Sequence, residues 1–193
     1  MNFDKLYIGG KWVAPATSNA FTVRSPHDGR VVGTSPAGSI TDIEAAVAAA
    51  RDAFDNGPWP HTPMADRIAA VERLTALFTA RMDRIAELIT DENGSTITFS
   101  KLGQVGGPLT VLLSLPAQAA AMEFEQARTG FIGSPLLVRR EPVGVVAAIT
   151  AWDVPQLRII ATPAPALLAV CPGVVNRSPW LPPSPPFPPP RYP

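Results

Sequence analysis

The chain has 193 residues and carries 16 Lys plus Arg against 16 Asp plus Glu, so its formal net charge is zero. A balanced charge provides no field that would attract nucleic acid or an anionic membrane, and we expect neither as a partner. The only cysteine, Cys171, excludes an internal disulfide, and with only two histidines besides it we expect no metal site.

The N-terminal segment argues against secretion, because it carries Asp4 early and lacks an apolar h-region. The longest uncharged apolar run, 159–175, has 17 residues and is interrupted by three prolines. A run this short and broken is not expected to span a bilayer. We therefore expect a cytoplasmic protein with one domain, or one and a fraction.

The first forty residues predict two hairpins. Residues 6–8 and 11–13 are short apolar runs on either side of Gly9-Gly10, which is a hairpin signal. A second pair, 21–23 and 31–33, flanks a turn rich in Ser, Pro, Asp and Gly.

Three amphipathic helices are predicted to follow. The sequence 41–44, Thr-Asp-Ile-Glu, has the pattern of a capping box, and Asn56-Gly57-Pro58 ends the helix that it opens. Thr62-Pro63 begins the second helix. The third carries apolar residues from Met82 onward at helical spacing and ends at Asn93-Gly94.

The second half of the chain predicts mixed elements. A fourth helix is expected from about residue 108 to 127, kinked or broken at Pro116. Strands are expected at 136–140 and 143–150, the latter short and buried because it is rich in β-branched residues. Residues 156–170 predict a weak helix, since they contain two prolines.

Residues 141–155, which read E-P-V-G-V-V-A-A-I-T-A-W-D-V-P, are the most informative segment. The predicted strand ends at Trp152 and Asp153, and Pro155 suits the first turn of a following helix. A strand that delivers a polar side chain to a helix N-terminus commonly builds a site, because free backbone N–H groups collect there.

Proline divides the chain. Of its 23 prolines, 9 lie in residues 176–193, and such a density prevents both helix and sheet interior. We predict a disordered, extended, polyproline-like tail over 176–193 and a folded region over 1–175.

Five of these segments, taken in order, resemble the aldehyde dehydrogenase family over about residues 6–175. Residues 7–13 are similar to the family's IGGxW hairpin, 25–33 to NPxTGxxI and 46–59 to AVxAAxxAFxxGxW. Residues from 67 onward resemble its next two helices. Residues 141–155 resemble E-P-x-G-V-x-x-x-I-x-x-W-N-x-P, with Asp153 where the family has Asn.

The resemblance implies an α/β fold, namely the N-terminal part of an aldehyde dehydrogenase: hairpins, helices, and the first strand and helix of the cofactor-binding domain. It implies NAD or NADP as cofactor, a small-molecule aldehyde oxidised to a carboxylate, and homo-oligomers in the parent family. The family's cysteine nucleophile and glutamate base have no counterpart in these residues. We therefore expect a truncated, inactive fragment.

The resemblance also assigns site residues. The family's Asn at position 153 donates a hydrogen bond to the oxyanion, whereas an ionised Asp153 only accepts. Asn176 stands where the family has a lysine that binds the adenosine ribose. The segment lying along the cofactor comprises Ile149, Thr150, Ala151 and Trp152.

Other interpretations stay open. Trp152 at a strand end is also consistent with a core or lid residue, but the match of the whole segment favours a position along the cofactor channel. A buried, inert thiol is the favoured interpretation of Cys171, and solvated loop residues are the favoured interpretation of His27 and His61. The tail's P-x-x-P-x-R sequence at 186–191 fits a polyproline ligand for SH3 domains, which would make the chain a non-catalytic interaction module. A reading frame shifted near codon 176 would also produce runs of Pro and Arg.

Overall fold

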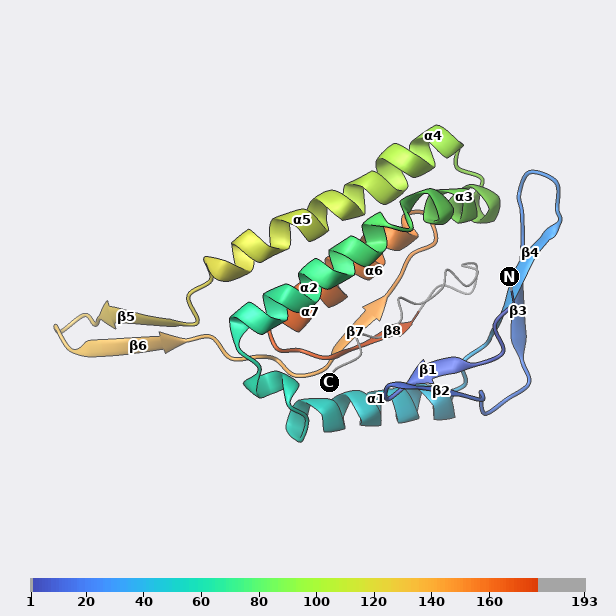
Figure 1. Cartoon of the computed structure of the whole chain (residues 1–193). Coiled ribbons are helices and arrows are strands. Elements are labelled where there is room, and N and C mark those ends of the chain that lie inside the picture. The colour runs from blue at the N-terminus through green and yellow to red at the C-terminus, as the bar shows by residue number, and fades with distance from the viewer. Residues whose placement is uncertain (1, 177–193) are drawn as a thin grey trace.

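The structure is a computed structural model that describes residues 2–176. Within that range the strands form four separate two-stranded sheets around a group of packed helices (Figure 1). Of the predicted tail at 176–193, residues 177–193 lie outside the described residues, and Asn176 is the last residue of a strand. No helix within residues 2–176 is both long enough and apolar enough to cross a membrane.

The two N-terminal hairpins are confirmed. Strand β1 (Leu6–Ile8) pairs with β2 (Lys11–Val13), and β3 (Ala20–Arg24) pairs with β4 (Val31–Pro36), both antiparallel. Gly9 and Gly10 both have positive φ, as a tight two-residue turn requires.

Helix α1 (Ile40–Asp55) lies beside the first hairpin (Figure 1). Its capping box is formed by Ser39 and Asp42, so the prediction of a box at 41–44 was wrong by two residues. Asp42 also accepts a hydrogen bond from the Ala16 N–H at 3.0 Å, and this contact with a distant loop favours the earlier start.

The core is helical. It is formed by α2 (Met64–Thr79), α3 (Met82–Asn93), α5 (Gly106–Ala120), α6 (Pro155–Ala161) and α7 (Pro163–Leu168). The second and third predicted helices are confirmed. The buried core residues are Val71, Phe78, Ile85, Ala86, Ile89, Val105, Leu112, Leu115, Ala119, Ile160, Ala164 and Leu168.

The fourth predicted helix was wrong at its end, and the break predicted at Pro116 is not present. A short helix α4 (Ile97–Phe99) and a π-helical segment η2 (Ser100–Val105) lead into α5, which is continuous through Pro116. Burial of Leu112, Leu115 and Ala119 on either side of the proline stabilises the helix there. A strand, β5 (Glu125–Thr129), follows where helix was expected.

Strands β5 and β6 (Pro135–Arg139) form a hairpin that projects away from the helices (Figure 1). Every residue of β6 is exposed, including Leu136 at 51% and Leu137 at 64%. The strand predicted at 136–140 is therefore present, shifted by one residue.

The strand predicted at 143–150 is shorter and only half buried. Strand β7 is Val146–Ile149, because Gly144 has a φ of +105° and Val143 is 88% exposed. A second strand, β8 (Gly173–Asn176), pairs with it in parallel, and α6 and α7 form the connection. The structure thus contains the predicted strand and helix, and β8 completes a βαβ unit.

Candidate functional site

The carboxyl ends of β7 and β8 bring three predicted site residues together. Ile149 lies opposite Asn176 in the parallel register, and the Thr150 N–H donates to the Asn176 carbonyl at 3.0 Å. The Thr150 side chain is buried, whereas Ile149 is 81% exposed. Ligands of open α/β sheets bind outside the carboxyl ends of the strands, which is where these residues lie.

A cleft of about 1010 Å³ opens between this sheet end, helix α1 and the first hairpin. Ile149, Thr150 and Asn176 line it, together with Val174 and Val175 of β8. The α1 side is formed by small apolar residues, namely Ala46, Ala49, Ala50 and Ala53. The cleft is therefore lined mainly by apolar groups, with a smaller number of polar groups that include the charged residues Lys5, Asp42 and Arg81.

Asp42 is an acidic group in this lining, and its carboxylate is already engaged. The Ser39 N–H donates to it at 2.8 Å and the Ser39 hydroxyl at 2.7 Å, and these hydrogen bonds, followed by that of the Ala16 N–H, hold the pKa of Asp42 below its usual value. Its role is to cap α1.

The other predicted site residues lie outside this cleft. Trp152 is 41% exposed, and the Asp153 side chain is exposed to solvent in the turn between β7 and α6. The backbone carbonyl of Asp153 accepts hydrogen bonds from Gln104 Nε2 at 2.7 Å and from Asn93 Nδ2 at 3.4 Å. The structure therefore places Ala151, Trp152 and Asp153 beyond the sheet end, separate from the cleft-lining group.

Sequence reasoning missed Gln104 and Asn93. Asn93 was identified only as part of a helix end, and Gln104 lay inside a segment to which no motif was assigned. The contact between Gln104 and Asp153 spans 49 residues, so no local pattern could reveal it.

Cys171 is buried, as expected, at 3% exposure. It lies before the amino end of β8, whereas Asn176 closes the carboxyl end, so its thiol is at the wrong end of the strand to reach the site. His27 and His61 are exposed. Residues 2–176 contain no cluster of three or more potential metal ligands.

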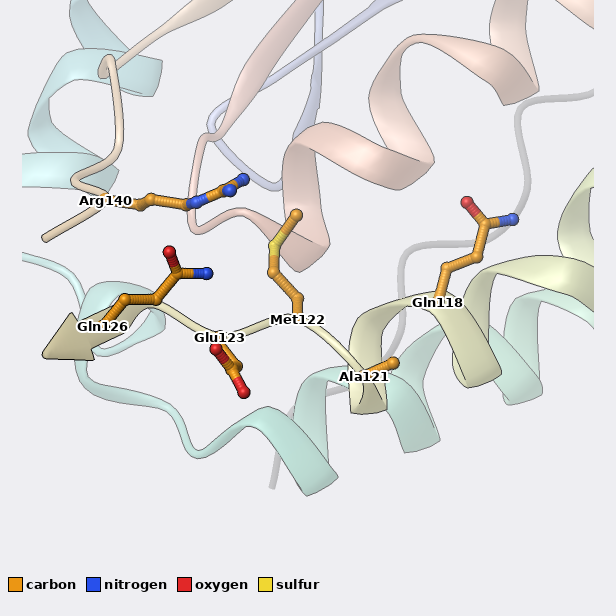
Figure 2. A pocket seen from close by; sticks show the side chains of 6 residues that line it. All are labelled: Gln118, Ala121, Met122, Glu123, Gln126 and Arg140. Atoms are coloured by element: carbon orange, nitrogen blue, oxygen red, sulfur yellow. The ribbon is translucent and has the colours of Figure 1, made fainter. Parts of the chain in front are cut away.

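A second, shallower hollow of about 340 Å³ lies at the base of the β5–β6 hairpin (Figure 2). Its lining consists of Gln118, Ala121, Met122, Glu123, Gln126 and Arg140. All of these except Gln126 are exposed, so the hollow lacks the buried polar groups of a built site.

The chain is similar to known proteins over most of its length. The sequence profile described as "Aldehyde dehydrogenase family" matches residues 12–185. The match thus extends past residue 175, where the resemblance was expected to end. Geranial dehydrogenase of Castellaniella defragrans is 31% identical over 92% of this chain and 37% of its own length. The 3-succinoylsemialdehyde-pyridine dehydrogenase of a Pseudomonas species is 33% identical over 92% of this chain and 36% of its own length.

Solved structures show the same fold. The crystal structure of Mycobacterium tuberculosis aldehyde dehydrogenase complexed with NAD+ is 41% identical, with a TM-score of 0.86, and the match covers 90% of this chain and 36% of that one. A Pseudomonas syringae aldehyde dehydrogenase, solved with NAD+ and octanal, is 32% identical with a TM-score of 0.85, over 92% of this chain and 35% of that one. The chain therefore spans little more than a third of these relatives, and it belongs to the aldehyde dehydrogenase family.

Proposed function

We propose that this chain supplies the first βαβ unit of an NAD(P)-binding site for aldehyde oxidation, and that these 193 residues alone do not catalyse the reaction. The observation that carries the proposal is the sheet end, where Ile149, Thr150 and Asn176 meet at the edge of the cleft. The solved relatives with bound NAD+ support the choice of cofactor.

The residues present fit a dinucleotide in part. Ile149 exposes 81% of its surface, which leaves apolar area at the carboxyl edge of the sheet for a planar ring or a ribose to cover. The Asn176 side chain is exposed and can exchange hydrogen bonds with ribose hydroxyls. It carries no charge, so it cannot replace the cation that the family has there, and we expect weak binding.

The cofactor, when bound, accepts a hydride from the substrate. Asp153 occupies the position at which the family stabilises the developing oxyanion, and its ionised carboxylate would repel that charge. The Asp153 side chain is exposed to solvent in the turn between β7 and α6.

The nucleophile is also missing from these residues. Thiohemiacetal formation needs an accessible thiolate. Cys171, the only cysteine of the sequence, is 3% exposed and lies at the opposite end of β8 from the site. Its burial argues against any direct role in attack on an aldehyde.

A panel of aliphatic and aromatic aldehydes with NAD+ or NADP+ tests this proposal through the absorbance of the reduced cofactor. We expect no rate above that of buffer, while calorimetric titration should detect weak binding of NAD+. Steady formation of NADH that is abolished by denaturing the protein would show that these residues catalyse the reaction, against the proposal. Absence of binding at millimolar NAD+ would refute the cofactor role.

Two further proposals concern association and location. The exposed apolar residues of the β5–β6 hairpin, among them Leu136 and Leu137, support association with other subunits, as the resemblance to the family implies. A cytoplasmic location rests on the sequence alone. The polyproline ligand at 186–191 lies outside the described residues, and no structural observation favours it.

A further inference from the structure

Two side-chain amides converge on one backbone carbonyl in the turn between β7 and α6. Gln104 Nε2 donates to the Asp153 carbonyl at 2.7 Å, and Asn93 Nδ2 donates to the same oxygen at 3.4 Å. Gln104 belongs to the π-helical segment η2 and Asn93 to the end of α3, so the two donors come from separate elements.

The surroundings of Gln104 show that its N–H groups are what the position requires. The residue is 4% exposed, and Nε2 also approaches Ser95 Oγ at 3.3 Å. Its Oε1 is buried and has no hydrogen-bond partner within residues 2–176. Burying an unpaired amide oxygen costs free energy that an apolar side chain of similar size would avoid. Rotating the amide would bring Oε1 against the Asp153 carbonyl, so the donor orientation is the favourable one.

The local backbone geometry orients both side-chain amides toward the Asp153 carbonyl. In η2, Gln104 and Val105 are adjacent and both buried, and Ser100 is held through a 2.9 Å contact between its hydroxyl and that of Thr90. Insertions of π-helix occur frequently at functional sites, where they redirect side chains. At the end of α3, the Asn93 Oδ1 accepts the Ser95 N–H at 2.9 Å, which leaves its Nδ2 for Asp153.

We infer that Gln104 and Asn93 are positioning residues that set the direction of the Asp153 side chain, with Trp152 next to it in the same turn. Both of those side chains are substantially exposed, so burial alone does not hold them. Fixing the carbonyl of Asp153 fixes the peptide plane that follows it and restricts the backbone from which the Asp153 side chain projects. The inference rests on the proposed function, since that function gives the direction of these side chains its importance.

Hydrogen exchange in this chain tests the inference without cofactor or activity. Gln104→Glu keeps the shape, but a carboxylate cannot donate, and Gln104→Met keeps the volume without polar atoms. The matched control is Gln118→Glu, an exposed residue of α5 whose amide bonds Ser114 Oγ at 2.9 Å. We measure the exchange protection of residues 150–158 against that of α2, together with acrylamide quenching of Trp152, assigned by its difference from Trp152→Phe.

Both Gln104 variants should lower protection of residues 150–158 about fivefold and increase quenching of Trp152, with α2 unchanged, since one hydrogen bond is lost locally. The control should change neither. Unaltered protection of 150–158 would overturn the inference. A parallel loss of protection in α2 and in the turn would also overturn it, because that is the result of a purely structural role.

An NAD+ titration of the unmodified chain separates the two claims. If the variants loosen the turn while the unmodified chain fails to bind NAD+, the proposed function fails and the positioning role stands. If NAD+ binds and the variants leave the turn unchanged, the positioning role fails and the proposed function stands.

Discussion

Gly94 ends α3 and lies close to Pro26 in the turn of the second hairpin, and its replacement by alanine should be costly for two separable reasons. Its φ is +78°, which an L-residue adopts at a cost of about 1–2 kcal/mol. A Cβ at this position would also lie 2.7 Å from Pro26 Cγ, well inside contact distance, and such overpacking costs about 1–3 kcal/mol. Gly94→Ala should therefore lower the free energy of unfolding by about 2–5 kcal/mol.

Gly29 provides the matched control. Its φ is +73°, and a Cβ there would meet nothing within 4 Å, so Gly29→Ala should show the backbone cost alone. Urea unfolding followed by circular dichroism measures both variants, and Pro26→Ala in the Gly94→Ala background should recover the steric part. Equal destabilisation by Gly94→Ala and Gly29→Ala would refute the packing of the hairpin turn on α3.

Three further predictions follow from burial and charge. Asp42 has a lowered pKa, so its contribution to stability is present above the unfolded-state value of about 4 and is lost as pH falls through the lower folded-state value. Asp42→Asn should make the urea midpoint fall less steeply as the pH is lowered, whereas Asp66→Asn, at an exposed side chain, should leave that dependence unchanged. Equal pH dependences of the two variants would contradict this. Phe78→Ala should cost about 3–5 kcal/mol by urea unfolding, because Phe78 is 0% exposed, whereas Phe99→Ala, at 55% exposure, should cost under about 1 kcal/mol. The chain should bind the dye ANS, and serine at the hairpin-tip residues Phe131 and Ile132, which are fully or almost fully exposed, should reduce that binding; a monodisperse monomer without dye binding would argue against exposed apolar surface.

Elements with strong local signals could be predicted from the sequence. The Gly-Gly turn specified the first hairpin, and Gly94, with its positive φ, ended α3 where expected. The start of α1 was ambiguous, because both Ser39 and Thr41 have an acidic residue three positions on. The Ala16 N–H, which bonds Asp42 from a distant loop, favours Ser39, and no local pattern contains that contact.

Strand β5 could not be predicted, because its sequence, E-Q-A-R-T, lacks apolar alternation and its stability comes from pairing with β6. In the candidate site, too, some residues could be predicted and others could not. Asp153 and Asn176 were identified because each replaces a residue that the family has at that position. Gln104 acts through a contact that only the fold creates.

The most direct measurement concerns Asp153. Residues 141–176 of this chain should be exchanged into an intact relative, for which the 41% identical Mycobacterium tuberculosis enzyme is suitable. With Asp153 present, kcat should fall by about 10²–10³-fold, because one oxyanion donor is replaced by an acceptor. Asp153→Asn within the exchanged segment should restore kcat, whereas Asn176→Lys should mainly restore the affinity for the cofactor. If Asp153→Asn leaves kcat unchanged in a folded protein that binds NAD+, position 153 does not stabilise the oxyanion, and the central claim is wrong.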